Sequence, residues 1–287
     1  MAKLPQPRAG DTDRGRGAAG PSGAPTTAGA DPQELLEVAC EAALRAGARL
    51  RERFARGRET RVSSKSTPTD PVSEADLESQ HTILALITER RPGDGFVAEE
   101  EAADRRGESG LRWVVDPLDG TVNYLYGIPQ WCVSIAVRDG EGTLAGVVHD
   151  PIAGDTFSAV RGELPSRNGE RLAHRGADSP ALARSLVATG FAYDAQVRSE
   201  QGRLLARMLP AVRDIRRFGS AALDLAWTAM GRWDAYYERG VKPWDIAAGV
   251  LVCECVGLVA QELGGGILVA PAPLAPQLAA LIAGAED

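Results

Sequence analysis

The segment that most constrains the fold is residues 113–124, which read WVVDPLDGTVNY. Its three leading apolar residues predict the end of a buried strand, and two carboxylates follow at once, Asp116 and Asp119. Pro117 between them lacks a backbone donor and fixes φ, so the chain leaves the strand in a set direction. Gly120 then permits a tight turn or a close approach to a ligand.

Two acids at the end of an apolar strand are costly, because like charges repel and burial disfavours the charged form. A hard divalent cation offsets that cost best, and Mg²⁺ is held by carboxylates together with substrate phosphate. The segment therefore points to metal chemistry. The other reading of these residues alone is a strand that ends in a solvated Asp-Pro turn, since Asp, Pro and Gly cluster in ordinary turns.

The charge balance argues against several classes of partner. The chain of 287 residues has a formal net charge of −7, so neither nucleic acid nor an anionic membrane is expected as its main partner. Hydrophobic residues make up 44% and charged residues 25%, as in an ordinary globular protein. No apolar run reaches the length of a membrane span, and the N-terminus lacks the apolar core of a signal peptide.

The cysteines and histidines suggest no other chemistry. The four cysteines are Cys40, Cys132, Cys253 and Cys255, and none has the spacing of metal ligands. Reduced, buried thiols in a cytoplasmic protein are therefore expected. The three histidines lie outside every motif described below, which argues against a histidine nucleophile, and no phosphate-binding loop of the nucleoside triphosphatases is present.

The order of elements predicts a layered α/β protein. Residues 1–30 have almost nothing to bury and are expected to be a disordered tail. Order begins with Asp31 as the cap of an amphipathic helix that runs to about Arg56, and a polar connection over residues 65–76 leads to a second helix capped by Ser73 and Asp76. Strands are then expected at 96–98, 132–137, 144–148 and 156–160, the last three as an antiparallel meander.

The second half alternates strands with helices. Strands are expected at 186–189, 215–217 and 233–238 and near 258 and 267, and helices at 198–209, after 219 to 230, from 244 to 256 and from 276. This alternation indicates layered α/β architecture within one domain over residues 31–287. Its N-terminal α+β half would span about 31–180 and its C-terminal α/β half about 181–287.

Further acids stand at the ends of elements. Glu99 follows a short apolar strand, Asp245 begins a helix, where a dipole end favours anions, and Asp70 lies in the polar connection. Each has a simpler explanation on its own: Glu99 could belong to a solvated run of charge, and Asp245 could be a helix cap. Their conjunction with Asp116 and Asp119 favours one metal site.

At this point the chain resembles the inositol monophosphatases, within the wider group of Mg²⁺-dependent, lithium-sensitive phosphatases. One signature is residues 116–124, continuing to 127–129 and 133–135, and a second is 244–249, continuing to Glu254. Residues 98–100, 65–76, 218–222 and 234–238 resemble further segments of that family. The resemblance covers about residues 31–283.

Two departures from the family's pattern are visible. The loop 162–169 has proline where the family has alanine. The segment after Val259 is short, so the last sheet is expected to be trimmed.

The resemblance implies an αβαβα sandwich with the active site between its halves, two or three Mg²⁺ ions, and a role for each matching residue. Metal ligands would be Glu99, Asp116, Asp119, Asp245 and the carbonyl of Leu118. Glu99 and Thr121 would orient and activate the attacking water. Gly120 and Thr121 would offer backbone N–H groups to phosphate. Substrate contacts would come from Leu118, Asp119, Gly120, Thr121, Gly219, Ser220, Ala221, Glu238 and Asp245. Asp70 would support the metal site from behind.

The activity implied is Mg²⁺-dependent hydrolysis of a small phosphate monoester by an activated water, without a phosphoenzyme, with inositol 1-phosphate as the leading substrate. Two metal ions suit this reaction, because one lowers the pKa of the water and the other stabilises the leaving alkoxide. The alternatives are fructose-1,6-bisphosphatase, histidinol-phosphatase and 3′-phosphoadenosine 5′-phosphate phosphatase activity, or a partner-binding protein with a vestigial site. The resemblance also implies a homodimer that acts on a small phosphorylated polyol, and the negative net charge already argues against nucleic acid and membrane as partners.

Overall fold

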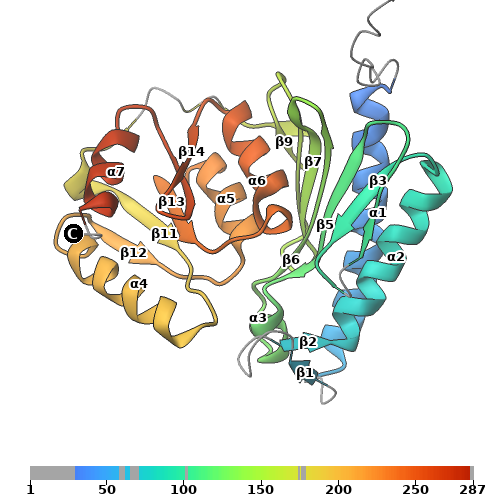
Figure 1. Cartoon of the computed structure of the whole chain (residues 1–287), viewed down its shortest axis with the longest axis horizontal. Coiled ribbons are helices and arrows are strands. Elements are labelled where there is room, and N and C mark those ends of the chain that lie inside the picture. The colour runs from blue at the N-terminus through green and yellow to red at the C-terminus, as the bar shows by residue number, and fades with distance from the viewer. Residues whose placement is uncertain are drawn as a thin grey trace, which may run out of the picture.

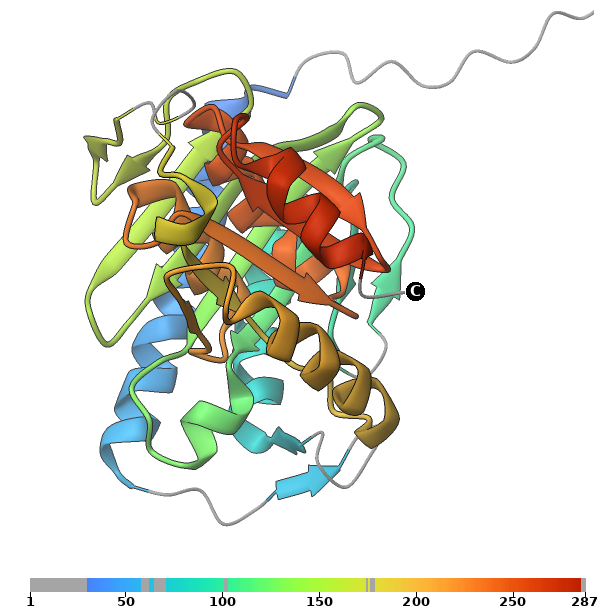
Figure 2. The same cartoon turned by 90° about the vertical axis from the view of Figure 1, so that its left-hand side faces the viewer.

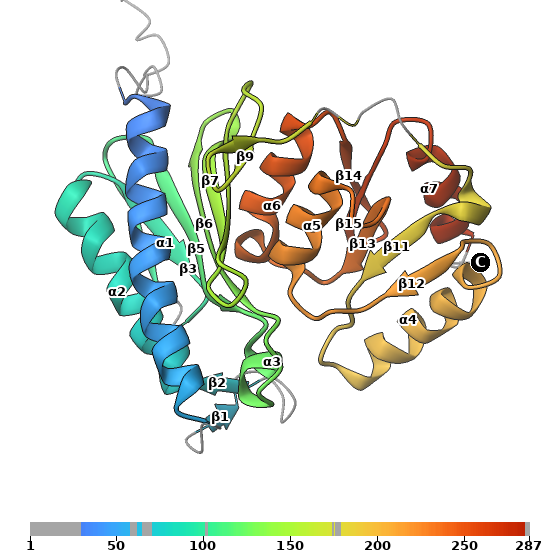
Figure 3. The ribbon, with the colours of Figure 1, turned by 180° about the vertical axis from the view of Figure 1, so that it is seen from behind.

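Five alternating layers of helices and sheets make up the molecule (Figure 1). The computed structural model describes residues 30–57, 62–64, 71–100, 103–173, 175 and 179–284. The layers are, in order, α1 and α2, a large sheet, α5 and α6, a smaller sheet, and α4 with α7, and the same order is seen from behind in Figure 3. The αβαβα sandwich expected from the sequence is confirmed. The predicted tail lies outside the described residues except for Ala30.

The first half carries the large sheet. Its helices are α1 (Pro32–Ala55), α2 (Glu74–Arg90) and the short α3 (Thr121–Leu125). Its strands are β3 (Gly95–Ala98), β4 (Asp104–Arg105), β5 (Arg112–Asp119), β6 (Cys132–Asp139), β7 (Gly142–Asp150), β8 (Asp155–Val160), β9 (Ser166–Arg167) and β10 (Glu170–Arg171). They lie in the order β10-β9-β8-β7-β6-β5-β3-β4, and only β3 and β5 pair in parallel. The predicted meander is β6–β8. A separate ribbon pairs β1 (Val62–Ser64) with β2 (Pro71–Ser73).

The second half carries a mixed sheet. Its strands are β11 (Leu186–Thr189), β12 (Asp214–Arg216), β13 (Ala235–Arg239), β14 (Val259–Leu263) and β15 (Gly266–Ala270), in the order β12-β11-β13-β15-β14. Its helices are α4 (Ala195–Met208), α5 (Ala221–Met230), α6 (Pro243–Cys255) and α7 (Ala275–Ala283). Strand β11 is parallel to both neighbours. The short segment after Val259 still forms a complete β14–β15 hairpin that adds two strands to this sheet.

Three apolar cores hold the layers together. The first packs α1 and α2 on one face of the large sheet, around Leu50, Ile83 and Trp113. The second lies between the two sheets, where α5 and α6 are buried on both sides. The third packs α4 and α7 on the outer face of the smaller sheet. Because the middle core contains residues of both sheets, the two halves share one apolar interior.

Helix starts follow the predicted caps. Asp31 accepts from the backbone N–H of Gln33 at the start of α1. Ser73 and Asp76 form the predicted reciprocal capping pair of α2. Helix α4 begins at Ala195, three residues before the predicted start, because Asp194 caps it through two backbone N–H groups.

Strand β5 differs from the prediction in an informative way. The apolar run was expected to end the strand at Val115, but β5 continues through Asp116 to Asp119. Its pairing with β6 shifts register between these two aspartates, where Pro117 has no N–H to donate to the ladder. The irregularity keeps both acids in the sheet while it turns them toward the seam between the halves.

Candidate active site

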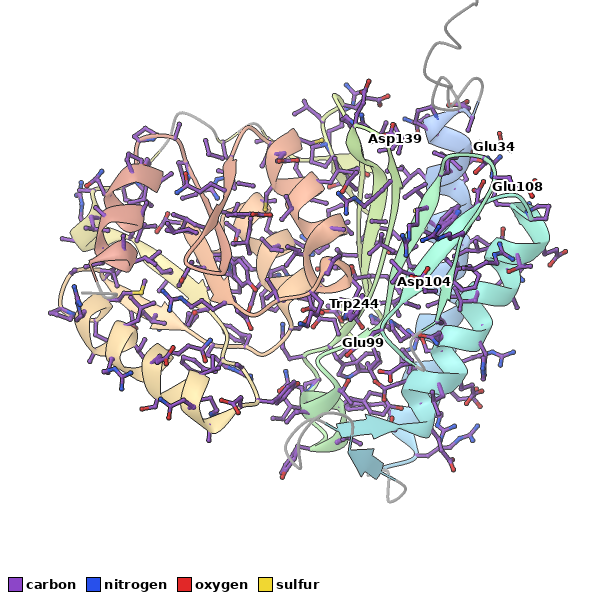
Figure 4. All side chains as sticks on the ribbon, in the orientation of Figure 1. Glu34, Glu99, Asp104, Glu108, Asp139 and Trp244 are labelled. Atoms are coloured by element: carbon purple, nitrogen blue, oxygen red, sulfur yellow. The ribbon has the colours of Figure 1, made fainter. Side chains whose placement is uncertain are left out.

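A cavity of about 580 Å³ lies at the seam between the two halves. It is lined by the ends of β3 and β5 and the starts of α3 and α6, which are called its floor, and by the loops that follow β11, β12 and β13, which are called its outer wall. Figure 2, seen from the side of the C-terminal half, shows this half in front of the large sheet. Glu99 and Trp244, which belong to opposite halves, both line it and lie beside the seam in Figure 4. The cavity is therefore built jointly by the two halves.

The four acids predicted as metal ligands all line this cavity. Glu99 follows β3, Asp116 and Asp119 belong to the end of β5, and Asp245 is the third residue of α6. Burial raises the pKa of Asp116 well above its usual range, and the charges of the other three acids raise it further. Burial likewise raises the pKa of Asp245 despite a hydrogen bond from the backbone N–H of Lys242. The acids thus raise one another's pKa, and a bound cation would relieve this repulsion.

Asp119 is held by the other half of the molecule. Its Oδ2 accepts from the Ser220 hydroxyl at 2.7 Å and from the Ala222 N–H at 2.7 Å, and its Oδ1 accepts from the Ala221 N–H at 3.2 Å. Helix α5 has no side-chain cap of its own, so Asp119 caps it from β5. Burial raises the pKa of Asp119 to about 6, and the donors from α5 oppose that rise. A single carboxylate therefore links the predicted metal site to the packing of the halves.

The donor set suits Mg²⁺, because it consists of carboxylates and a backbone carbonyl with no sulfur or imidazole. Within the described ranges, no three His, Cys, Asp or Glu side chains already stand in the arrangement of a formed metal site. In this arrangement Asp116 accepts from the Leu118 N–H, Asp119 accepts from α5, and Asp245 accepts from the Lys242 N–H. Binding would require these oxygens to turn or to be shared.

Thr121, predicted to orient the attacking water, has its hydroxyl held by two buried acceptors. Its hydroxyl lies 2.8 Å from Oδ1 of Asp76 and 3.1 Å from the carbonyl oxygen of Leu118, both of which can accept its proton. Asp76 is fully buried and at the same time caps α2 through Ser73. The sequence revealed Asp76 only as a helix cap, because a cap motif carries no sign of a second partner 45 residues away.

Glu238, predicted to contact the substrate alcohol, stands in the outer part of the cavity. Its Oε2 accepts from the Tyr236 hydroxyl at 2.7 Å. Its carboxylate packs on Gly190 so closely that a Cβ at that glycine would lie 2.0 Å from an Oε atom. Burial raises the pKa of Glu238 to about 7, with the Asp119 charge adding to the rise and the Arg217 charge opposing it. A side chain at position 190 would therefore displace the Glu238 carboxylate from this place.

Most predicted site residues meet at the cavity. Those that line it are Glu99, Asp116, Leu118, Asp119, Gly120, Thr121, Gly219, Ala221, Glu238 and Asp245. Ser220 lies beneath, bonded to Asp119. Asp70 lies outside the described residues. The cations Arg217, Arg239 and Lys242 also line the cavity, although the sequence analysis did not single them out. Each lies next to a motif, so its place in the sequence could have indicated it.

Buried Asp224 in α5 was also missed. Its Oδ1 has no hydrogen-bond partner among the described residues, and burial followed by the Glu238 charge raises its pKa well above the usual range. An Asp in an apolar helix is a signal that the sequence offered.

Comparison with known proteins identifies close relatives. The model of the inositol monophosphatase family matches residues 31–286. The inositol-1-monophosphatase SuhB of Mycobacterium tuberculosis is 43% identical over 224 residues, which are 74% of this chain and 77% of the relative. A protein of Pasteurella multocida named Nus factor SuhB is 40% identical over 247 residues, which are 83% of this chain and 91% of the relative.

Solved structures agree with the fold. The extragenic suppressor protein suhB of Bartonella henselae superposes with a TM-score of 0.81 at 32% identity, covering 87% of this chain and 98% of the other. Mycobacterium tuberculosis SuhB superposes with a TM-score of 0.75 at 38% identity, covering 89% and 98%.

Proposed function

Because this chain belongs to the inositol monophosphatase family, we propose that it is a Mg²⁺-dependent phosphate monoester hydrolase whose leading substrate is inositol 1-phosphate. The family is one of phosphatases, so the enzyme class is a phosphoric monoester hydrolase. The proposal concerns the substrate, the metal ion and the mechanism of this enzyme.

One observation carries the proposal most directly. Glu99, Asp116, Asp119 and Asp245 come from separate places in the sequence and line one cavity of about 580 Å³. Their mutual repulsion raises the pKa of Asp116 and Asp245 after burial has already done so. A cluster of acids that is costly without a cation and lies beside a carbonyl acceptor is typical of a Mg²⁺ site.

Each residue then has a task in the reaction. Glu99, Asp116, Asp119, Asp245 and the Leu118 carbonyl would hold two or three Mg²⁺ ions. When bound, Mg²⁺ supplies charge neutralisation for the phosphoryl oxygens and acidity for the attacking water. Thr121, held by Asp76, and Glu99 orient that water in line with the ester bond. The Gly120 and Thr121 N–H groups position the phosphate.

The alcohol end of the substrate meets the C-terminal half. Glu238 accepts hydrogen bonds from polyol hydroxyls and repels phosphate, so it would orient the substrate with its ester toward the acids. Gly219, Ser220 and Ala221 pack beneath the sugar-like ring. Water enters at phosphorus, the P–O bond to the alcohol breaks, and phosphate and the free alcohol are the products.

The direct test is release of phosphate from inositol 1-phosphate, with Mg²⁺ and after removal of metal by EDTA. We expect turnover only with Mg²⁺, and restoration when Mg²⁺ is added back. A panel with fructose 1,6-bisphosphate, histidinol phosphate and 3′-phosphoadenosine 5′-phosphate ranks the remaining candidates. Absence of phosphate release from every ester at saturating Mg²⁺ would contradict the proposal.

A second candidate is binding of a macromolecular partner. It is favoured by the name of the Pasteurella multocida relative, which is called a Nus factor. The described chain keeps all four acids at the cavity, so a vestigial phosphatase site has no support here. Turnover of the purified protein alone would separate the two roles, since a pure binding protein would release no phosphate.

The homodimer and the cytoplasmic location stay predictions. None of the described helices is long and apolar enough to cross a membrane, and the four cysteines are unpaired. Light scattering on the full chain measures the oligomeric state.

A further inference from the structure

Helix α2 carries a buried polar stripe in its first turns. Asp76, Ser79 and Gln80 recur at helical spacing, so their side chains share one face of the helix. Their exposed fractions are 0%, 1% and 2%. The buried residues that follow in this helix are all apolar and include Ile83 and Ile87. Because a buried polar group costs free energy unless it is hydrogen-bonded, the stripe needs partners.

The partners of this stripe belong to the segments that form the floor of the cavity. Its first member accepts from the Thr121 hydroxyl, as described above. The Ser79 hydroxyl donates to the Pro117 carbonyl at 2.7 Å. The Gln80 amide contacts the Glu100 backbone twice, because Nε2 donates to the carbonyl and Oε1 accepts from the N–H, each at 2.9 Å. The first turns of α2 lie beside the end of β5 in Figure 1.

Gln80 fixes the segment that carries Glu99. On one side of this segment, the Glu99 N–H donates to the Val115 carbonyl of β5 at 3.2 Å. On the other side, both backbone groups of Glu100 are bonded to the Gln80 amide. The Glu99 backbone is therefore held between the sheet and α2, although β3 itself ends at Ala98. A glutamine amide can do this because it offers a donor and an acceptor side by side, as a neighbouring strand would.

Ser79 supplies a partner at the irregular end of β5. The register shift between β5 and β6 leaves Pro117 and Leu118 without a paired residue in β6. Pro117 is buried, and the Ser79 hydroxyl gives its carbonyl a donor at this point. Leu118, whose carbonyl is a proposed metal ligand, follows directly. Ser79 thus helps to set the course of the chain through that ligand.

We propose that Ser79 and Gln80 are positioning residues of the metal site, which hold the backbone of its ligand segments so that Mg²⁺ binding requires only rotation of carboxylates. The inference rests on the proposed function, because it concerns how the proposed ligands Glu99 and Leu118 are held. Neither is among the described residues that line the cavity, so each acts through the segment that it holds. Loss of a residue that orients a metal ligand commonly weakens metal binding about ten- to a hundred-fold.

The competing explanation is that both side chains only satisfy buried backbone groups and so stabilise the fold. Both explanations expect a lower melting temperature when the hydrogen bonds are removed. They differ in the Mg²⁺ affinity of the folded variants, because only the positioning role makes that affinity depend on Ser79 and Gln80.

The test is calorimetric titration of the full chain with Mg²⁺ in the absence of substrate. Gln80→Met keeps the length of the side chain but removes both hydrogen bonds to Glu100, and its Kd for Mg²⁺ should rise at least about ten-fold. Ser79→Ala removes one hydrogen bond, and its Kd should rise about three- to ten-fold. At saturating Mg²⁺ both variants should lower kcat for inositol 1-phosphate and leave its KM within about two-fold.

Two variants of the same helix serve as matched controls. Ile83→Val weakens the apolar packing of α2 and leaves the stripe intact. Thr82→Val removes a hydroxyl that donates to the Glu78 carbonyl within the helix, so it matches Ser79→Ala in the kind of bond lost. The melting temperature should fall in Ile83→Val, and Kd for Mg²⁺ should stay within about two-fold of the natural chain in both controls.

An unchanged Kd in Gln80→Met and Ser79→Ala, with only the melting temperature lowered, overturns the inference in favour of a structural role. A rise in Kd as large in the controls also overturns it, because a general loosening of α2 would then explain the effect. Circular dichroism melts show which variants fold, and Ser79→Ala decides the question if Gln80→Met does not. A natural chain that binds no Mg²⁺ would overturn the proposed function together with this inference, so the two failures are distinct.

Discussion

The floor and the outer wall of the cavity differ in the charges that surround their acids. At the floor, acids from the end of β3, from β5 and from α6 line one cavity, and burial together with the charges of neighbouring acids raises the pKa of Asp116 and Asp245. At the outer wall, Glu238 has an arginine beside it and a tyrosine hydroxyl bonded to it. The acids of the floor thus raise one another's pKa, while at the wall the Tyr236 hydroxyl and the Arg217 charge oppose the rise in the pKa of Glu238. This contrast indicates that chemistry belongs to the floor and selection of the substrate to the wall.

The largest expected effect comes from the floor. Asp116→Asn keeps the shape of the side chain but removes a charge from the proposed metal site. We expect about a thousand-fold or greater loss of kcat on every ester, because the whole reaction depends on the metal. The metal-free variant should melt at the same temperature as the natural chain or higher, since repulsion is relieved. If the variant turned over substrate at the rate of the natural chain at saturating Mg²⁺, the metal assignment would be refuted. Calorimetric titration with Mg²⁺ provides a readout that is independent of turnover.

A smaller and selective effect is expected at the wall. Glu238→Gln should lower kcat/KM for inositol 1-phosphate about ten- to a hundred-fold, as expected for a lost charge-assisted hydrogen bond. Hydrolysis of p-nitrophenyl phosphate, which lacks the polyol hydroxyls, should change little. Equal losses on both substrates would assign Glu238 to the metal site instead. Tyr236→Phe removes only the hydroxyl that supports Glu238 and should give a loss of a few-fold in the same direction.

The contrast also predicts a dependence of stability on pH. Asp119 has a pKa raised to about 6 and Glu238 to about 7, so the folded state binds more protons than the unfolded state between about pH 4 and 7. Stability therefore falls as pH rises through that window. In EDTA we expect a melting temperature about 5 °C lower at pH 7.5 than at pH 5. Addition of Mg²⁺ at pH 7.5 should recover most of that loss, and no recovery would mean that the acids do not meet a metal.

The smallest effect is expected from the tail. Residues 1–30 contain no apolar periodicity and no acid of the site motifs, so their deletion should leave melting temperature and turnover essentially unchanged. Asp31, which caps α1, stays in the shortened chain. A fall of more than about 3 °C, or of more than two-fold in kcat/KM, would show that the tail packs on one end of the cavity or on the fold.

Local signals in the sequence predicted much of the fold. The caps at Asp31 and Ser73 and the alternating strands 132–160 depend on neighbours within a few residues, and the structure confirms them. The bounds were less accurate where a contact from elsewhere sets them. Strand β5 continues past Val115 because β6 pairs with it through Asp119, and no local pattern contains that partner.

The sequence by itself determined which acids are available and that they stand at the ends of elements, because motif spacing and apolar runs are properties of one stretch of chain. Only the tertiary structure decided how those acids are held. Asp119 caps α5 from across the seam, and Asp76 accepts a hydrogen bond from the Thr121 hydroxyl while it caps α2. The cations Arg217, Arg239 and Lys242 likewise come to one cavity only when β11, β12 and β13 align their carboxyl ends. Such contacts join residues far apart in sequence, and packing of the two halves is the physical step that creates them.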